Sequence, residues 1–380
     1  MKSSFRLATP RLALAVSAAM LLLSACSSSP SRPEPAALTA FKASLPASQL
    51  WKFELGVPAP QSVPALVGSE VALASEAGTV LVLDATSGSP RWRAQLDDRI
   101  AVGTGYDGQT AAVLTQGNEL VALAQGKVLW RSRLASRAFT APLVAGGRVF
   151  VQSGERGIAA YDARNGARLW SQAARGTEPL VLQQSGVLLA VGDTLVVGMG
   201  ARLVGLNPNN GSIRWEAPLA SARGVNEIER LVDLVGPAAR QQRQLCVRAF
   251  QSAVGCVDAQ RGAISWSKPA NGSVGLASDG SAVYGVEANG RVMAWKADGG
   301  DLLWQSDLLL NRALSAPLAA GRSIAIGDGQ GYVHLLARED GKLLNRLTTD
   351  GSAIVSAPLL AGNNLLALTR KGALYAWRPE

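Results

Sequence analysis

Cysteine, histidine and charged residues are all scarce in this 380-residue chain. It has three cysteines, one histidine, 5% aromatic residues and 17% charged residues. No cysteine–histidine set has metal-site spacing, and neither an H-E-x-x-H motif nor a nucleophile elbow occurs. Of the net charge of +9, +3 lies in the first 25 residues, and the remaining +6 forms no cluster of basic and aromatic residues. This distribution argues against nucleic acid as a partner.

The N-terminus has the pattern of a secretory signal. Lys2, Arg6 and Arg11 precede an apolar run at 12–23, which is too short to span a bilayer. The run leads into L-S-A-C, which ends at Cys26 and resembles the bacterial lipoprotein box. That resemblance implies cleavage before Cys26, its lipidation, and anchoring to a membrane through the acyl chains. The alternative is an ordinary secretory signal with an incidental cysteine.

The residues after the cysteine predict a location and a linker. Ser27 stands where an aspartate would, in enteric bacteria, resemble an inner-membrane retention signal, so the resemblance implies the outer membrane. Residues 27–48 are rich in Ser, Pro and Ala and can bury little, which predicts a flexible tether. The predicted parts of the chain are a signal peptide (1–25), a lipidated cysteine with its tether (26–48) and a folded domain (49–380).

From residue 51 onward the chain repeats about every 40 residues. The repeated phrase is a tryptophan four residues after a glycine, as in GARLW at 166–170 and GDLLW at 300–304. One further step falls on Asn345 in GKLLN, a degenerate copy. Eight copies of a unit of this length indicate a solenoid or a propeller. The tryptophans at the repeat position are Trp51, Trp92, Trp130, Trp170, Trp215, Trp266 and Trp304.

The interior of each unit favours the propeller. Residues 140–173 contain four short apolar segments separated by Gly, Asn and Asp turns, and no helical period is sustained. Four strands in a 40-residue unit make a propeller blade. The last copy, 356–378, has only three strands, and the segment 50–55 can supply the fourth. The sequence therefore predicts an all-β, eight-bladed β-propeller of four-stranded antiparallel blades, closed where the N-terminal strand joins the C-terminal blade.

The repeated phrase has a structural interpretation. Asp84, Asp162, Asp258 and Asn207 end the third strand of their units, where their side chains can hydrogen-bond the turn backbone. The glycine supplies a positive φ angle. The tryptophan opens the outer strand and can lay its ring against the next blade, burying roughly 150–250 Å². We interpret the seven tryptophans as blade-docking residues whose indole N–H groups need acceptors.

The spaced motif D-x-x-x-G-x-x-x-W resembles the blade repeat of the quinoprotein dehydrogenases, which bind pyrroloquinoline quinone. That resemblance implies a calcium ion held by acidic and amide side chains, an aspartate base and a disulfide between adjacent cysteines. No adjacent cysteines occur, and the single histidine, His334, lies in the alternating segment YVHLL, which is typical of a packed strand. We therefore expect no catalytic residue, cofactor or metal. A membrane-anchored, quinone-dependent periplasmic dehydrogenase is the alternative.

Longer strings cover nearly the whole chain and are more specific. RVMAWKADGGDLLWQSDLL (291–309), GDGQGYVHLL (327–336) and NEIERLVD (226–233) resemble the BamB family, lipoprotein subunits of the outer-membrane β-barrel assembly machine. The resemblance implies a non-catalytic propeller at the periplasmic face of the outer membrane. It also implies binding to the POTRA domains of BamA, and through BamA to the other subunits, and assistance in folding and inserting outer-membrane proteins. Direct contact with unfolded client chains stays an open question.

Two inserts are expected to form the contact surface. The step from Trp170 to Trp215 is 45 residues and the next, to Trp266, is 51, so extra residues fall between blades at both places. Loops on a rigid scaffold are where binding surfaces usually lie. The longer insert places apolar residues at helical spacing, which indicates either a capping helix or irregular loop packed on the propeller, or a partner contact. These residues are Ile228, Leu231, Val232 and Val235.

The BamB resemblance implies which residues make this contact. In that family the surface includes a Leu-x-Leu-Arg segment in the shorter insert and acidic residues after an E-I-x-R-L string. The matching positions here are Leu180, Leu182, Gln183, Arg230 and Asp233. Two positions depart from the pattern, because Gln183 replaces the arginine and Val235 stands in place of a second acid. Exposed Leu180 and Leu182, together with Asp233, are the predicted contact residues.

The two remaining cysteines are expected to face each other. LCVRAF and VGCVDA have the pattern of neighbouring strands joined by a short turn near Gln251. Such a hairpin places Cys246 opposite Cys256, with Cβ atoms roughly 4.5–5.5 Å apart. In an oxidising periplasm this pair can form a disulfide. Two unpaired core thiols are the alternative.

Overall fold

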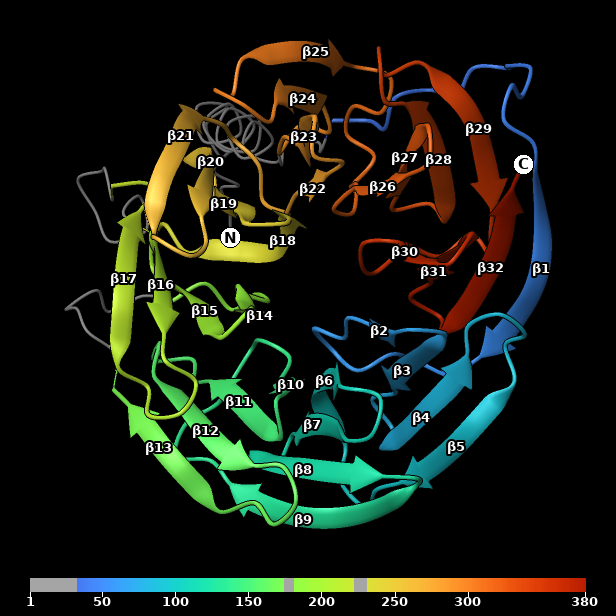
Figure 1. Cartoon of the computed structure of the whole chain (residues 1–380). Helices are drawn as coiled ribbons and strands as arrows, with labels where there is room; N and C mark the ends of the chain where they lie inside the picture. Colours follow the sequence, from blue (N-terminus) through green and yellow to red (C-terminus); the bar gives the residue numbers. More distant parts are fainter. Residues whose placement is uncertain (1–32, 174–180, 222–230) are drawn as a thin grey trace, which may run out of the picture. The chain divides into compact units, whose positions relative to one another are not determined.

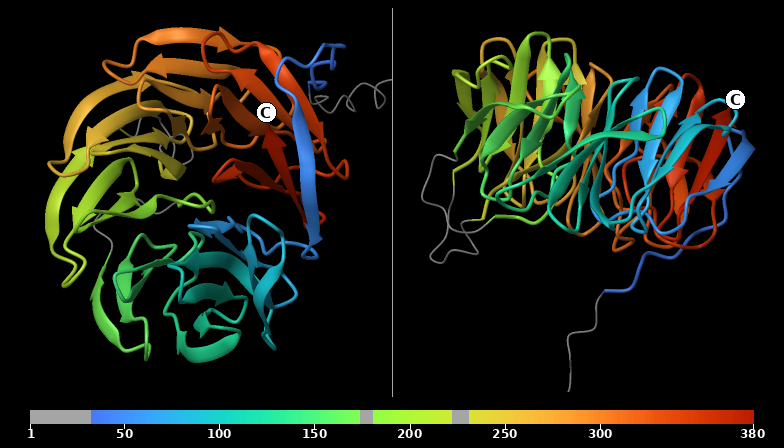
Figure 2. Two further views of the ribbon diagram at one scale, coloured as in Figure 1. Left: turned by 45° about the vertical axis from the view of Figure 1, so that its right-hand side comes forward. Right: turned by 90° about the horizontal axis from the view of Figure 1, so that it is seen from below.

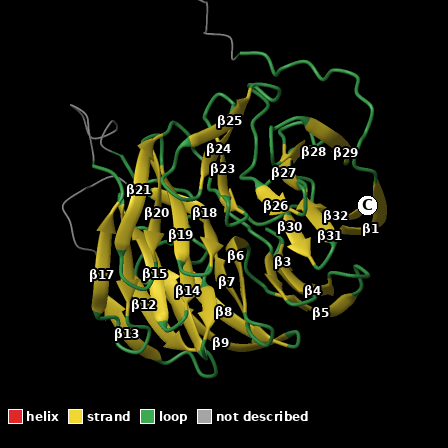
Figure 3. Cartoon of the chain, turned by 45° about the horizontal axis from the view of Figure 1, so that its top comes forward, coloured by secondary structure: helices red, strands yellow, loops and turns green. Residues whose placement is uncertain are grey.

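The computed structural model describes residues 33–173, 181–221 and 231–380. It divides the chain into Met1–Pro35 and a compact unit, Ala36–Glu380. Within the described ranges the compact unit consists of strands and loops (Figure 3), and none of these residues belongs to a helix that could cross a membrane.

The strands form eight four-stranded antiparallel sheets arranged as blades around a ring (Figure 1), which confirms the predicted fold. Blade 1 contains β2 (Ala65–Val67), β3 (Glu70–Ala74), β4 (Thr79–Asp84) and β5 (Pro90–Gln95). Blade 2 contains β6 (Ile100–Tyr106), β7 (Ala111–Thr115), β8 (Glu119–Ala124) and β9 (Lys127–Arg133). Blade 3 contains β10 (Leu143–Ala145), β11 (Arg148–Gln152), β12 (Ile158–Asp162) and β13 (Arg168–Gln172). Blade 4 contains β14 (Leu188–Val191), β15 (Thr194–Met199), β16 (Arg202–Leu206) and β17 (Ile213–Pro218).

The second half of the ring repeats this order from the centre outward. Blade 5 contains β18 (Leu234–Gln241), β19 (Gln244–Ala249), β20 (Ala253–Asp258) and β21 (Ala263–Pro269). Blade 6 contains β22 (Ala277–Ser278), β23 (Ala282–Val286), β24 (Val292–Lys296) and β25 (Leu302–Ser306). Blade 7 contains β26 (Leu318–Ala320), β27 (Ser323–Gly327), β28 (Tyr332–Ala337) and β29 (Leu343–Thr348). Blade 8 contains β30 (Leu359–Ala361), β31 (Asn364–Leu368), β32 (Ala373–Pro379) and, outermost, β1 (Ala47–Glu54).

The ring closes in blade 8, as predicted. Strand β1 pairs antiparallel with β32, so that Ala47 lies opposite Pro379 and Glu54 opposite Ala373. The middle strands are buried on both faces because each blade packs against two neighbours (Figure 2), and β4, for example, is buried along Thr79–Leu83. Closure leaves no blade with an uncovered face, and the apolar core lies between the blades.

The glycine and the tryptophan of the repeated phrase meet across blade boundaries. Six of the seven tryptophan rings cover the turn glycine of the following blade, whose φ angle lies between 69° and 74°. A Cβ atom on any of these glycines would lie 2.4–2.7 Å from the tryptophan, so only glycine fits. The pairs are Trp51 with Gly88, Trp130 with Gly166, Trp170 with Gly211, Trp215 with Gly262, Trp266 with Gly300 and Trp304 with Gly341. Trp92 has no such partner, because the turn after β8 is reduced to Gln125–Gly126.

The same turns satisfy most of the indole N–H groups. Trp51, for example, donates to the Thr86 carbonyl at 2.9 Å, and Asp84 in that turn accepts from the Thr86 and Ser87 amides. The equivalent acceptors are the carbonyls of Ala163 for Trp130, Pro208 for Trp170, Ala297 for Trp266 and Arg338 for Trp304. Trp215 differs, since its indole nitrogen is buried and has no partner within the described part of the chain.

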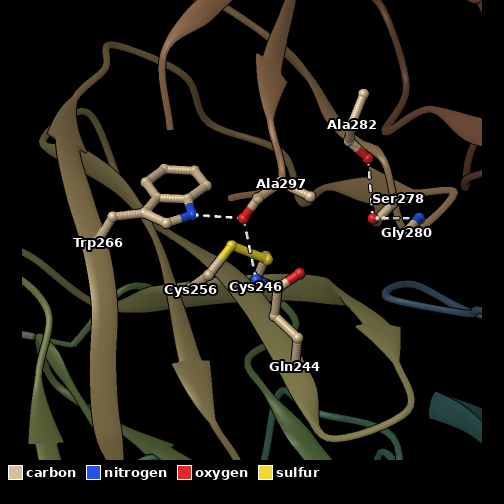
Figure 4. Close-up of a disulfide and its surroundings, with 8 residues drawn as sticks. All are labelled: Gln244, Cys246, Cys256, Trp266, Ser278, Gly280, Ala282 and Ala297. Carbon is tan, nitrogen blue, oxygen red and sulfur yellow. Dashed lines mark hydrogen bonds between the residues drawn. A yellow bond between two sulfur atoms is a disulfide. The ribbon is translucent and has the colours of Figure 1, made fainter. Parts of the chain in front are cut away.

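Cys246 and Cys256 are direct neighbours on β19 and β20 and are joined by a disulfide. Their Cα atoms are 4.0 Å apart, and both residues are buried between blades 5 and 6. Figure 4 shows the bridge beside Trp266, whose indole N–H shares the Ala297 carbonyl with the Gln244 side-chain amide. The bridge therefore lies under one of the blade-to-blade contacts.

Removing this bridge is expected to destabilise the propeller. The bridge joins residues ten positions apart. The Cys246→Ala/Cys256→Ala variant should therefore lose up to about 3 kcal/mol of unfolding free energy. Urea unfolding with and without a reductant measures the effect. The reductant should lower the midpoint of the parent chain and leave the variant unchanged. A parent midpoint that does not respond to complete reduction would contradict the prediction.

Part of the predicted tether is docked on the propeller. Residues 36–46, within the predicted 26–48, lie along blade 7 instead of extending freely, and Leu45 is 4% exposed. The Ser44 amide donates to the Leu344 carbonyl at 2.9 Å. Composition missed this contact because most of it is made by backbone groups, which any residue type carries.

Candidate partner-binding site

The shorter insert ends in residues 181–186, here called the crossing segment, which runs over one face of the propeller. Its Gln183 carbonyl accepts from Gln61 of blade 1 at 3.2 Å. The Gly186 amide donates to the Thr140 hydroxyl at 2.9 Å, at the entrance to blade 3. Gly186 also forms an isolated β-bridge with Val235 of blade 5. The crossing segment therefore touches three blades besides leading into blade 4.

Asp233, at the end of the longer insert, holds the two inserts together. Its Oδ1 accepts from Nε and Nη2 of Arg156 at 3.0 and 2.9 Å, and its Oδ2 accepts from the Leu182 amide at 2.7 Å. Arg156 lies in the turn between β11 and β12, with a φ angle of 63°. Hydrogen bonds with an ionised donor or acceptor are the strong ones, and all three are accepted by a carboxylate that is 8% exposed. We call Asp233, Arg156 and the Leu182 amide the insert clamp.

The clamp gives Asp233, which the sequence predicts as a contact residue, a partner within the chain itself. Asp233 is buried because its charge is used internally by Arg156, 77 positions away in the sequence. Leu182 is half-buried, and Gln183 is exposed. The predicted residues Leu180 and Arg230, like Cys26, lie outside the described residues.

Of the alternatives that the helical spacing in the longer insert left open, the capping helix is wrong for the described residues, whereas an irregular loop packed on the propeller agrees with Val232, which is 7% exposed. Leu231 and Val232 are not helical, and Val235, 2% exposed, is part of strand β18. Apolar residues recur there because the chain turns into the buried inner strand of blade 5, where both faces are covered. Ile228 lies outside the described residues.

The crossing segment contributes to the lining of two hollows. A cavity of about 40 Å³ lies beneath it, lined by Gln152, Arg156, Leu182 and Asp233 among others. The Gln152 Oε1 atom is buried there with no partner among the described residues, and the cavity has room for a water molecule. A groove of about 420 Å³ lies outside it, and its lining includes Phe139 and Gln183. The surface around Gln183 is therefore built jointly by the segment and by blades 1 to 3.

The centre of the ring does not fit a calcium ion and quinone. A cavity of about 570 Å³ there is lined mostly by small and apolar residues, and among the described residues its charged lining residues are Glu76 and Arg370, beside the amides of Gln61 and Gln184. Glu76 already pairs with Arg99. No group of three acidic, histidine or cysteine side chains is arranged for a metal within the described ranges. The lining therefore offers a single carboxylate, already paired with an arginine, where a calcium ion is usually held by several acidic side chains.

His334, the single histidine, belongs to a buried network in blade 7. Its Nε2 lies 2.9 Å from Oδ2 of Asp328, which also accepts from Nε of Arg312 at 2.8 Å. Burial lowers the pKa of His334. Burial alone would raise the pKa of Asp328, but the hydrogen bonds from His334 and the Tyr332 amide outweigh it and hold that pKa below its ordinary value. With both Asp328 and His334 fully buried, the network has no access to a substrate.

Comparison with known proteins identifies the family. A family model described as outer membrane protein assembly factor BamB matches residues 42–102, 79–306 and 296–379. The outer membrane protein assembly factor BamB of Burkholderia pseudomallei is 36% identical over 372 residues, which cover 97% of each chain. The chain belongs to the BamB family. The BamB of Bordetella pertussis is 34% identical over 94% of this chain and 95% of its own length.

Solved structures agree with this assignment. The crystal structure of BamB from Moraxella catarrhalis superposes with a TM-score of 0.78 at 25% identity, covering 87% of this chain and 99% of its own. A quinohemoprotein alcohol dehydrogenase from Pseudomonas putida superposes with a TM-score of 0.66 at 13% identity, covering 87% of this chain and 76% of its own. The second likeness shows the shared propeller fold alone.

In this BamB-family chain, the sequence interpretation missed Arg156 and Gln61. Arg156 stands in the G-E-R-G turn of blade 3, and a charged residue in a tight turn carries no sign of a distant partner. Gln61 precedes the first strand of blade 1 and contacts the Gln183 backbone. The one available signal was that both residues lie in loops at strand ends, where inserts from other blades can meet them.

Proposed function

We propose that the chain is a non-catalytic scaffold subunit of the outer-membrane β-barrel assembly machine, where it binds the POTRA domains of BamA and assists folding and insertion of outer-membrane proteins. Membership of the BamB family supports this assignment. The proposed location is the periplasmic face of the outer membrane, with a lipid anchor on Cys26. The observation that carries the proposed contact is the insert clamp, which fixes two inserts of one face as a single surface.

In this proposal Asp233 positions the contact surface instead of touching BamA. Its carboxylate is fully engaged by Arg156 and the Leu182 amide. The groups left for the partner are the exposed Gln183 and the half-buried Leu182 side chain. Leu180 and Arg230 are proposed as further contacts on the grounds of family resemblance. The lining of the central cavity supports the absence of quinone chemistry.

Capture of BamA from detergent-solubilised envelopes tests the function. We expect the lipidated parent chain to recover BamA, and the Leu180→Asp/Leu182→Asp variant to lose it while its circular dichroism stays that of the folded propeller. Failure of the parent to recover BamA in a preparation where the complex is otherwise intact would overturn the assignment. Dye reduction after addition of calcium and pyrroloquinoline quinone would favour the dehydrogenase instead.

A second capture experiment tests the role of the clamp. Arg156→Gln removes the cation and leaves the Asp233 carboxylate unchanged, so capture should weaken at least tenfold if Asp233 acts by positioning the inserts. Asp233→Asn should weaken it similarly. Asp193→Ala is the matched control, because Asp193 pairs with Arg214 on the surface and its side chain is 85% exposed. Full capture by Arg156→Gln combined with loss in Asp233→Asn would instead make Asp233 a direct contact.

A further inference from the structure

Residues Ala36–Pro46, here called the strap, are fastened to the propeller by backbone hydrogen bonds along their length. The Ala36 amide donates to the Leu310 carbonyl at 2.8 Å, in the connection from blade 6 to blade 7. At the other end, the Pro46 carbonyl accepts from the amide of Glu380, the last residue of the chain, at 2.9 Å. The strap is therefore held at its first and last residues by parts of the chain that lie hundreds of positions away.

Side chains of blade 7 recognise the strap through its carbonyl groups. Arg322 donates to the Ser44 carbonyl at 2.8 Å, and Asn345 donates to the Leu45 carbonyl at the same distance. The guanidinium of Arg346 lies 5.0 Å from the ring centre of Phe41, a cation–π contact. These donors come from separate positions of one blade and converge on one extended segment.

The first anchor of the strap is preorganised. Nη1 of Arg312 donates to the Ala36 carbonyl at 2.8 Å, and Arg312 is 3% exposed. Its guanidinium is held by Asp328, which is itself held by His334. A cation fixed in this way loses little freedom when it binds a carbonyl, which favours a stable contact. The buried network of blade 7 therefore positions Arg312 to bind the Ala36 carbonyl.

Asn345 explains why the strap docks on this blade. In six of the other seven blades the corresponding tryptophan covers the turn glycine of the next blade. Blade 8 takes its outer strand, β1, from the other end of the chain, so it has no turn there for a tryptophan to cover. Leu45 packs at this boundary instead, in a core cluster with Leu347 and Trp377. The degenerate repeat at Asn345 is therefore the docking site of the strap.

We propose that the strap stays docked in the mature protein and leaves only the residue steps from Cys26 to Ala36 between the lipid anchor and the propeller. This inference rests on the proposed lipidation of Cys26. Ten residue steps reach at most about 35 Å, whereas the 21 steps from Cys26 to Ala47 would reach about 70–75 Å. The docked strap therefore holds the propeller, at the boundary of blades 6 and 7, within about half the distance that the sequence alone would allow.

Amide hydrogen exchange on the full-length chain tests the docking. The amides of Ala36 and Ser44 should exchange at least tenfold more slowly in the parent than in Leu45→Asp, which places a charge in the buried pocket. The Arg322→Ala/Arg346→Ala variant, which spares the core, serves if Leu45→Asp fails to fold. Leu169→Asp, at a position 46% exposed, is the matched control and should exchange like the parent. Exchange in the parent as fast as in an unstructured peptide would overturn the proposal.

Neutron reflectometry on supported bilayers of phosphatidylethanolamine and phosphatidylglycerol tests the shortened reach. The lipidated parent should form a protein layer whose near edge stays within about 35 Å of the headgroups. A coil of 21 steps has an r.m.s. length of about 23–28 Å against about 16–19 Å for 10 steps, so the layer of the strap variants should lie farther from the headgroups on average and be broader. Equal layer positions for parent and variants would overturn the limit on reach. The Cys26→Ser variant separates the lipid anchor from the docking of the strap. Retention of this variant on the bilayer would refute the lipid anchor, whereas the hydrogen-exchange result tests the docking independently.

Discussion

Replacing Glu287 with alanine is expected to lower the free energy of unfolding by about 3–5 kcal/mol. Glu287 pairs with Arg248 at 3.0 Å, and the Arg248 side chain is fully buried between blades 5 and 6. Nε and Nη2 of Arg248 already have no partner among the described residues, and burial lowers its pKa. Removing the carboxylate would leave a buried guanidinium without its counter-charge, and chemical denaturation of the two proteins measures the difference.

Two further variants make this prediction specific. Arg248→Met/Glu287→Leu removes both charges, and it should recover most of the lost stability because an apolar pair avoids the desolvation cost of an ion pair. Asp301→Ala is the control: Asp301 pairs with Lys268 on the surface with 79% of its side chain exposed, so its loss should change little. A Glu287→Ala effect no larger than that of Asp301→Ala would show that Arg248 finds another way to satisfy its charge.

The fold could be predicted from the sequence because its determinants are local and repeated. The spacing between a glycine and the next tryptophan recurs, and each turn has Gly, Asn or Asp residues that predict it. The last copy has three strands, and the N-terminal segment supplies the missing fourth. The opposition of Cys246 and Cys256 followed from one short hairpin. Each of these inferences needs only residues close together in the sequence, or the counting of copies.

The site was less predictable because its determinants act between distant segments. Asp233 looked like a contact residue, since nothing near it in the sequence indicates that Arg156 takes up its charge. The strap looked like a tether, since carbonyl groups accept hydrogen bonds whatever the side chain is. Asn345 was correctly placed as a degenerate repeat, but the reason for its divergence lies in the missing turn of blade 8. Burial and pairing across blades are properties of the ring, not of any one repeat.

The glycine of the repeated phrase is expected to be essential for two separate reasons, which a pair of variants can separate. Gly166→Ala forces alanine into a φ angle of 74° and places its Cβ 2.6 Å from the ring of Trp130. The backbone strain costs about 1–2 kcal/mol, and crowding a packed ring adds about 1–3 kcal/mol. We therefore expect a total loss of about 2–5 kcal/mol in chemical denaturation.

Gly147→Ala is the matched control within the same blade. Its φ angle of 72° imposes nearly the same strain, but a Cβ there would meet no atom within 4 Å. Its loss should therefore stay near the strain alone, about 1–2 kcal/mol. The difference between the two variants isolates the contact between blades. Equal losses would mean that the glycine is required by its turn only, and that the tryptophan of the preceding blade can move aside without cost.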